Sequence, residues 1–243
     1  MRKRLLLALA ILAGLFAGYQ WATWPDVARL AEADPETSTF IERQRRQVGR
    51  PVGHSWVPYP AISDDLKLAV LVAEDIGFFD HRGFAVDEMR IALRQTVAEG
   101  RRLRGASTIT QQLAKNLWLS PSRSPWRKAE EAILTWQLER RLEKRRILEL
   151  YLNVVELGPG VYGAEAAARR YFRKPAGALG EAEAAELAAS LPRPASWPMR
   201  GGASAPSTSR ARPSRRRCIA ASCCQRGRPS RGLPSSTRVA RPR

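Results

Sequence analysis

Residues 1–200 of this 243-residue chain contain no cysteine. The three cysteines, Cys218, Cys223 and Cys224, all follow residue 200. A disulfide framework for the main part of the chain is therefore excluded. A cysteine-free body suits an oxidising compartment outside the cytoplasm and suits the cytosol equally well, so the cysteine content leaves the compartment open.

Acidic residues are also scarce. The chain has 23 Asp and Glu against 41 Lys and Arg, which gives a formal net charge of +18. Such a charge is typical of proteins that bind nucleic acid. However, eleven arginines lie in residues 201–243, which contain no Lys, Asp or Glu, so only about +7 belongs to the rest of the chain. We therefore expect no nucleic-acid partner. A non-enzymatic basic membrane protein that binds nucleic acid through its arginine tail is kept as an alternative.

No segment alternates apolar and polar residues over any length, and no internal repeat is evident. Helical patterns occur instead in residues 64–74, 86–100, 111–119, 127–153, 161–172 and 181–191. Hydrophobic residues make up 44% of the chain, which is enough for one sizeable core. The sequence therefore predicts a mainly α fold with helices around one core.

Residues 1–24 combine a basic start with an apolar run that begins at Leu5. A run of about 20 such residues can span a bilayer, and the basic start is then expected on the cytoplasmic side. We favour a transmembrane anchor. A cleaved signal peptide is the alternative, because residues 5–17 also have the length of a signal-peptide core.

The remaining chain divides into three predicted parts. Residues 25–55 are polar and contain prolines, which is typical of a stalk, so regular structure is expected to begin after them. Residues 56–200 are the predicted catalytic domain. Residues 201–243 are rich in Arg, Pro and Ser and are predicted to be disordered. Their composition differs so abruptly that we hypothesise an altered reading frame.

The first candidate site is the segment EDIGFFDHRG, residues 74–83, at the end of a predicted helix. Helix capping begins at Ser63, and Glu74 closes the helix. Three carboxylates and His81 beside aromatic residues suit general acid and base chemistry. A polar junction between helix and loop is the structural alternative. Metal binding is less favoured because His81 is the only nitrogen ligand in the segment.

The second candidate, residues 105–112 (GASTITQQ), enters a helix that continues to Lys115 and precedes Arg123. A turn of small and hydroxyl residues at a helix start can bind an anion, or can be an ordinary helix cap. The third, RKAEE at residues 127–131, places Arg127 and Glu131 on one helical face. That pair is either a helix-surface ion pair or part of a diphosphate grip. The fourth, residues 144–153, is explicable as helix packing.

Taken in order, these segments resemble the glycosyltransferase family 51 domain of peptidoglycan polymerases. That family includes monofunctional transglycosylases and the first domain of bifunctional penicillin-binding proteins. The resemblance is carried by EDxxFxxHxG, GxSTITQQ, RKxxE and KxxILExYLN, and GVYGAEAAARRYFRK at residues 160–174 is similar to a fifth family segment. It extends from about residue 56 to 197. It implies a mostly α, lysozyme-like domain of two lobes around a cleft.

The resemblance also implies a reaction and residue roles. Family members polymerise lipid II, a disaccharide-peptide joined to a polyprenol by a diphosphate. Glu74 would be the catalytic base that deprotonates the acceptor sugar hydroxyl, and Glu131 would be the second catalytic carboxylate, which positions basic groups or a divalent metal. The diphosphate-binding residues would be Lys115, Arg123, Arg127 and Lys128, with Gln111, Gln112 and Ser107 shaping the site.

Further expectations follow from the resemblance. A divalent cation such as Mg²⁺ would accompany the substrate diphosphate, because magnesium favours phosphate and carboxylate oxygens. The expected partners are lipid II, the nascent glycan chain, membrane lipids and other cell-wall synthesis proteins. The enzyme would lie in the bacterial cytoplasmic membrane with its catalytic domain on the outer face. No Ser-x-x-Lys acylation motif is found, so a monofunctional enzyme is expected. A lysozyme-like lytic glycosidase is the rival function.

Overall fold

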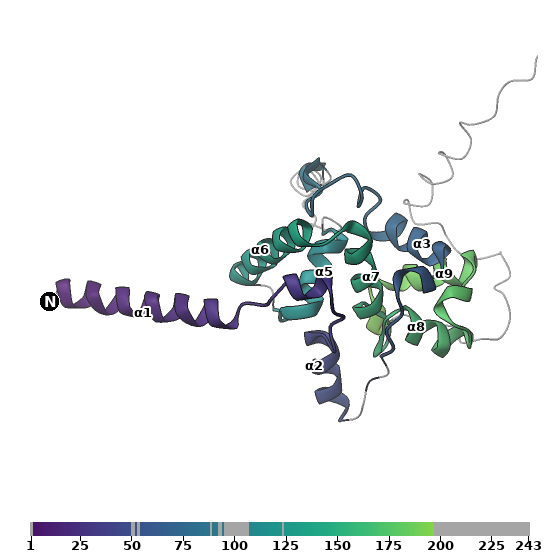
Figure 1. Ribbon diagram of the computed structural model, residues 1–243, viewed down its shortest axis with the longest axis horizontal. Coiled ribbons are helices and arrows are strands. Elements are labelled where there is room, and N and C mark those ends of the chain that lie inside the picture. The colour runs from purple at the N-terminus through teal and green to yellow at the C-terminus, as the bar shows by residue number, and fades with distance from the viewer. Residues whose placement is uncertain are drawn as a thin grey trace, which may run out of the picture. The chain divides into compact units, whose positions relative to one another are not determined.

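The computed structural model describes residues 2–49, 52, 54–87, 89–91, 94, 107–122 and 124–196. The described chain is mainly helical, as predicted (Figure 1). Its α-helices are α1 (Arg2–Thr23), α2 (Thr39–Val48), α3 (Asp64–Glu74), α5 (Ile109–Trp118), α6 (Pro125–Arg141), α7 (Lys144–Val154), α8 (Ala164–Ala167) and α9 (Glu181–Ser190). A π-helical turn, Ala168–Phe172, continues α8. Short 3-10 helices occupy Ala28–Ala31, Tyr59–Ala61, Ala176–Ala178 and Pro194–Ser196.

Helix α5 lies at the centre of the helical packing, against both α6 and α7, and α3 packs on α9 (Figure 1). The side chains of Ile109 and Leu113 on α5 are completely buried, as are Leu138 on α6 and Ile147 on α7. Burying side chains of this size contributes roughly 1.5 to 3 kcal/mol each. The core therefore fixes α5, which carries several of the predicted site residues, between two neighbouring helices.

Helix α3 begins and ends where the sequence predicts. The Ser63 hydroxyl caps it by accepting a hydrogen bond from the Asp65 backbone N–H, and Asp64 and Asp65 occupy its first turn. Acidic residues there complement the positive end of the helix dipole. The same Ser63 hydroxyl donates to the Leu179 carbonyl, which ties the start of α3 to the segment before α9. Glu74 is the last residue of the helix.

The single helix predicted for residues 127–153 is wrong, because the structure has two helices, α6 and α7, in this range. Leu142 ends α6 in an extended conformation, with φ −121° and ψ 145°, and Glu143 starts α7. The Leu142 side chain is buried at the turn. The apolar spacing gives no sign of the break, because Leu142, which ends α6, is also a core residue.

Regular structure begins earlier than the sequence predicts, within the expected stalk at residues 25–55. Helix α2 lies there, capped by Ser38 at its start and ended by Gly49, whose φ of 63° is left-handed. Ile41 of α2 is fully buried and packs with Val52 and Tyr162. The prolines flank this helix and do not interrupt it, so the proline content was a wrong sign that regular structure is absent here.

The helix predicted for residues 161–172 starts later, at Ala164. Residues Val161–Tyr162 form strand β2, which pairs antiparallel with β1 (Glu156–Gly158). Gly163 follows with φ +86°, and a Cβ there would lie 2.6 Å from the Asn153 carbonyl oxygen. Only glycine accepts both the backbone conformation and the close approach. The glycine-rich segment therefore turns the chain tightly before helix α8.

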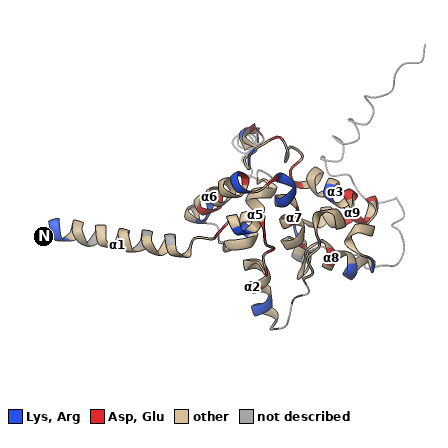
Figure 2. Cartoon of the chain, viewed as in Figure 1, with Lys and Arg blue, Asp and Glu red and all other residues tan. Residues whose placement is uncertain are grey.

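Helix α1 covers the predicted apolar N-terminal segment, with Lys and Arg only at its start (Figure 2). Large apolar side chains along it, such as Leu6 and Leu15, are exposed. Among the described residues, no helix combines the length and the hydropathy needed to cross a membrane. The side chain of Gln20 near its end donates a hydrogen bond to Glu130 on α6 (Nε2 to Oε1, 3.2 Å).

Two predictions concern residues that the structure describes in part or not at all. The helix predicted for residues 86–100 has helical residues at 86–87, 89–91 and 94, and its other positions lie outside the described residues. The tail, residues 201–243, also lies outside them, so its predicted disorder stays a prediction.

Candidate active site

Glu74 lies at the junction of α3 and α5. The Nε2 of Gln112, one turn into α5, donates a hydrogen bond of 2.8 Å to Glu74 Oε2. Gln112 Oε1 accepts a bond of 3.2 Å from the hydroxyl of Tyr151 on α7. The carboxylate is half-buried. The structure therefore brings together the two predicted residues Glu74 and Gln112 and adds a third, Tyr151.

Asp75 clamps the end of α3 to the start of α5. Its carboxylate is 3% exposed, and Oδ2 accepts the Ile109 backbone N–H at 3.0 Å. Ile109 is the first residue of α5, where helix N–H groups lack intrahelical partners and the dipole favours an anion. Oδ1 lies 2.8 Å from His81 Nε2. Both oxygens of this carboxylate are thus used to hold its neighbour Glu74 beside α5.

His81 is oriented by the loop that follows α3. The Gly83 backbone N–H donates to His81 Nδ1 at 3.1 Å, so the proton is assigned to Nε2, which donates to Asp75. Gly83 has φ +82°, and a Cβ there would lie 2.7 Å from the Thr135 methyl carbon. The Gly83 carbonyl accepts the Thr108 hydroxyl at 2.7 Å. Most of the EDxxFxxHxG motif is therefore a scaffold around Glu74.

A second cluster combines two cations with one carboxylate. On α6, Glu131 is 3% exposed, and its two oxygens form ion pairs with Arg127 and Lys128 respectively. The Arg127 side chain is mostly buried, whereas that of Lys128 is 50% exposed. Within the described part of the chain, Arg127 Nε is a buried nitrogen with no hydrogen-bond partner. Glu131 thus holds two basic groups in place, one buried and one at the surface.

Lys115 on α5 interacts electrostatically with this cluster and with Glu74. Burial lowers the pKa of Lys115, and this is the largest effect. The carboxylates Glu131 and Glu74 raise the pKa, whereas the cations Arg127 and Lys128 lower it further. Its Nζ also lies 5.8 Å from the centre of the Phe40 ring on α2. Because burial disfavours the charged form and the carboxylates favour it, Lys115 is a cation that a further anion would stabilise.

The remaining predicted site residues are Gln111, Ser107 and Arg123. Gln111 is buried in the cap of α5, where its Oε1 accepts the Thr108 N–H at 3.1 Å. Its side chain therefore fixes the helix start, and Gln112 is the glutamine that contacts Glu74. Ser107 is exposed and precedes the cap. Arg123 lies outside the described residues.

Sequence reasoning missed the parts played by Asp75, Tyr151 and Asn153. Asn153 joins α7 to the chain at Val57, whose N–H it accepts and to whose carbonyl it donates, each at 2.9 Å. Both Tyr151 and Asn153 belong to the YLN end of a pattern that looks like ordinary helix packing. The available signal was the presence of polar groups at positions of a helix face that is otherwise apolar.

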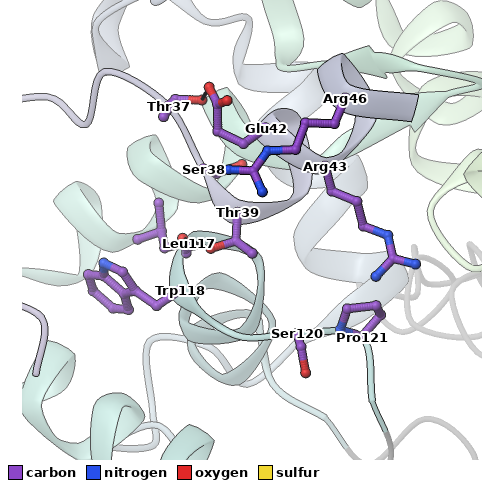
Figure 3. Close-up of a pocket in the computed structure, with 10 residues that line it drawn as sticks. All are labelled: Thr37, Ser38, Thr39, Glu42, Arg43, Arg46, Leu117, Trp118, Ser120 and Pro121. Atoms are coloured by element: carbon purple, nitrogen blue, oxygen red, sulfur yellow. Dashed lines mark hydrogen bonds between the residues drawn. The ribbon is translucent and has the colours of Figure 1, made fainter. Parts of the chain in front are cut away.

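A pocket of about 450 Å³ lies between α2 and the end of α5 (Figure 3). Arg43 and Arg46 extend from α2, and Trp118 and Pro121 come from the end of α5 and the segment after it. Neither Glu74 nor any member of the cationic cluster lines it. The pocket combines cations with apolar surface, which suits an amphipathic anion better than a reacting centre.

The described residues do not fit a magnesium ion held by protein ligands. They contain no group of three or more His, Cys, Asp or Glu side chains that could hold a metal ion. The carboxylate oxygens of Glu131 are taken by Arg127 and Lys128, and Asp75 is committed to His81 and the α5 backbone.

Comparison with known proteins agrees with this architecture. The pattern of the Transglycosylase family matches residues 42–221, beginning within α2 and extending past residue 200. A biosynthetic peptidoglycan transglycosylase of Azoarcus sp. (strain BH72) is 50% identical over 192 residues, covering 76% of this chain and 83% of the relative. A protein of the same name from Methylobacillus flagellatus is 46% identical over 197 residues, covering 79% and 84%. This chain belongs to the transglycosylase family.

Proposed function

We propose that this chain is a peptidoglycan glycosyltransferase that polymerises lipid II into glycan strands during cell-wall synthesis. The observation that carries the proposal is the pairing of one hydrogen-bonded carboxylate, Glu74, with the cationic cluster of Lys115, Arg127, Lys128 and Glu131. Proteins named biosynthetic peptidoglycan transglycosylase, up to 50% identical over most of the chain, support it. We also propose the two-lobed, lysozyme-like arrangement of the family for this domain.

Glu74 acts as the general base in this proposal. It accepts the proton of the acceptor sugar 4-hydroxyl as that oxygen forms a bond to the anomeric carbon of the growing chain. The bond from that carbon to the diphosphate breaks on the opposite face, so the configuration inverts. Positioned general bases contribute about 10²- to 10⁴-fold to rate. The Gln112 amide donates to Oε2 and so helps to orient the carboxylate that we propose as the base.

The cationic cluster stabilises the leaving group. Breaking the sugar–oxygen bond concentrates negative charge on the diphosphate, and fixed cations lower the energy of that state most. Arg127 and Lys128 are already oriented by Glu131, so little reorganisation is needed. Arg127 Nε has no acceptor among the described residues, and Lys115 would regain favourable charge contacts beside an anion. We propose Arg123 as a further member on the family resemblance alone.

A lytic glycosidase needs a second carboxyl group that protonates the leaving oxygen. Glu131 is poorly suited to that task, because two cations occupy its carboxylate and it is almost completely buried. A diphosphate leaves without protonation, and it needs cations instead. The site chemistry therefore favours transfer from a diphosphate donor over hydrolysis.

Any divalent cation such as Mg²⁺ is proposed to arrive with the substrate diphosphate. Magnesium is commonly held by substrate phosphates with only one or two carboxylates. When bound, it would supply additional positive charge to the diphosphate oxygens. The protein side chains bind and orient the diphosphate without it.

We further propose that α1 holds the domain at the outer face of the cytoplasmic membrane, where lipid II and membrane lipids are its partners. Near its end, Gln20 bonds to Glu130, the neighbour of Glu131, and Trp24 bonds to Gln137 on the same helix, α6. On α6, Trp126, Ile133 and Trp136 are exposed, which suits an interface with headgroups. A polyprenol-linked substrate would then meet the cationic cluster close to the bilayer. Other cell-wall synthesis proteins are also proposed as partners.

Lipid II supplied to the full chain in detergent tests the function. Long glycan strands with release of polyprenyl diphosphate are expected, and preformed peptidoglycan should stay intact. Shortening of preformed glycan without polymer synthesis would instead establish the lytic glycosidase. The same assay separates a catalyst from a basic binding protein, which would produce neither result.

A further inference from the structure

Tyr151 stands behind the proposed base, at the far side of Gln112. Its side chain is completely buried in the core face of α7, so it has no access to substrate. Its hydroxyl nevertheless contacts a group of the active site: it lies 3.2 Å from Gln112 Oε1, and Gln112 Nε2 lies 2.8 Å from Glu74 Oε2. Three helices, α7, α5 and α3, are connected by this chain of two hydrogen bonds.

The orientation of the Gln112 amide decides whether Glu74 accepts a hydrogen bond from its nitrogen or faces its oxygen. The two ends of a carboxamide have nearly the same shape, but one donates hydrogen bonds and the other accepts them. With Nε2 toward Glu74 the amide donates to the carboxylate. With the amide reversed, its oxygen would face and repel a carboxylate oxygen, and the hydrogen bond that Gln112 donates to Glu74 would be lost.

The Tyr151 hydroxyl selects the productive direction. Burial raises the pKa of Tyr151 well above its usual value, and the charges of Glu74 and Asp75 raise it further, so the phenol keeps its proton. Among the described residues, Gln112 Oε1 is the acceptor that the hydroxyl has. Reversing the amide would leave a buried phenol proton without an acceptor, which is costly in a desolvated site.

We propose that Tyr151 is a positioning residue for the catalytic base: it fixes the Gln112 amide so that its N–H groups point at Glu74 and hold that carboxylate in one orientation. This inference rests on the proposed function, in which Glu74 is the base. Tyr151 touches no reacting atom, and its effect on the reaction passes through Gln112.

A purely structural role for Tyr151 makes a different prediction. The ring fills the core whether or not it carries a hydroxyl, so Tyr151→Phe keeps the packing and removes only the bond to Gln112. If the residue merely fills space, this variant keeps the wild-type kcat and pH profile. Tyr162→Phe is the matched control, because Tyr162 is also buried but packs with Ile41 and Val52, away from Glu74.

The experiment measures lipid II polymerisation by the full chain in detergent, with kcat, KM and the pH dependence of kcat, and with thermal unfolding to confirm folding. For Tyr151→Phe we expect kcat to fall on the order of 10-fold, with KM within about twofold. The acidic limb should move to higher pH, because an amide oxygen beside Glu74 disfavours its anion. The variant leaves the charged groups Asp75 and Lys115 unchanged. Tyr162→Phe should match the wild type.

A double variant shows whether the effect passes through Gln112. Gln112→Leu removes the intermediate group, so Tyr151→Phe in that background should cause no further loss of kcat. An equal loss in both backgrounds would overturn the proposal, as would an unchanged kcat and pH profile in a folded Tyr151→Phe single variant. Glu74→Gln separates the two claims. If it stays active, the assignment of the base fails; if it is inactive while Tyr151→Phe is normal, only the positioning inference fails.

Discussion

The two halves of the proposed site use carboxylates in opposite ways. At the end of α3, Glu74 accepts a hydrogen bond from the neutral Gln112 amide and is the proposed acceptor of a substrate proton. On α6, Glu131 is buried between Arg127 and Lys128 and serves to orient those cations. In the proposed mechanism, the same residue type thus serves as a base in one place and as a structural counter-ion in the other. Glu131 forms ion pairs with two cations, which suits a counter-ion better than a group that accepts a substrate proton.

The largest expected effect comes from removing the proposed base. Glu74→Gln keeps the size of the side chain but cannot accept a proton, so kcat for lipid II polymerisation should fall about 10²- to 10⁴-fold. Initial rates on purified lipid II measure this loss. Glu181→Gln, an exposed glutamate at the start of α9, is the control and should be as active as the wild type. Full activity in Glu74→Gln would remove Glu74 from the chemistry.

Breaking the clamp beside Glu74 should damage both stability and activity. Asp75→Asn removes a buried charge that bonds to His81 and to the α5 N-terminus. Hydrogen bonds to charged groups contribute about 1.5 to 3 kcal/mol, so the free energy of unfolding should fall by about that amount. Denaturant unfolding of the full chain measures the change. Asp80→Asn, at an exposed position in the same loop, should leave stability unchanged. Equal stabilities for both variants would show that the clamp contributes nothing.

The cationic cluster should set an alkaline limit to the activity. The pKa of Lys115 is lowered from its ordinary value of 10.5, chiefly by burial. As pH rises through this lowered value, Lys115 loses its proton and the site loses a cation, so kcat/KM should decline at a pH below 10.5. In Lys115→Arg the decline should move to higher pH, because arginine stays protonated. An unchanged alkaline limb in that variant would assign the decline to another group.

The lowered pKa of Lys115 also determines how its contribution to folding stability changes with pH. Because the unfolded chain binds this proton more tightly than the folded chain does, the contribution of Lys115 to folding becomes more favourable as pH rises through the lowered pKa. Lys115→Met should therefore weaken substrate binding without lowering the free energy of unfolding. Parallel measurements of KM and of chemical unfolding test both halves of this expectation.

The smallest expected effect on turnover concerns two exposed tryptophans of α6, Trp126 and Trp136. Replacing Trp126 and Trp136 by Gln should reduce turnover in vesicles of anionic lipid about two- to fivefold, because their exposed rings are proposed to lie among headgroups. Turnover in detergent should not change. Leu68→Gln, an exposed apolar residue on α3, is the control. Equal losses in vesicles and in detergent would indicate a folding defect and not a membrane contact.

The pocket between α2 and α5 offers a second test of the same membrane contact. Arg43→Gln with Arg46→Gln should weaken binding to vesicles of anionic lipid by up to roughly 2 kcal/mol, since each basic residue near the surface contributes roughly 1 kcal/mol. Salt should weaken the wild type more than the variant. Co-sedimentation with vesicles measures both changes. Identical binding by the two proteins would leave the pocket without this role.

Local signals in the sequence predicted the parts of the fold that depend on neighbours in the chain. The hydroxyl of Ser63 followed by two acidic residues located the start of α3 and hence placed Glu74 at its end. The break between α6 and α7 was missed because Leu142 satisfies the apolar pattern of both helices while adopting an extended backbone. Helix α2 was missed because its burial depends on Tyr162, far away in the sequence.

For the candidate site too, the sequence predicted some features and not others. Carboxylates, amides and cations were identified as candidates from their types and order, but their partners could not be. Gln111 and Gln112 are adjacent and chemically identical, yet one caps α5 and the other reaches Glu74. Which of them turns toward α3 is set by the packing of α5 against α7. Tyr151 likewise gains its importance only from a contact across 39 residues of sequence.

The most direct test of the contrast between the two carboxylate sites measures binding and turnover separately. Binding of polyprenyl diphosphate to the full chain is compared with the kcat for lipid II in Glu74→Gln and in Arg127→Gln. The account predicts that Glu74→Gln binds within about twofold of the wild type and turns over at least about 100-fold more slowly. Arg127→Gln should bind at least about 10-fold more weakly. Equal losses of binding in both variants, or normal turnover in Glu74→Gln, would contradict it.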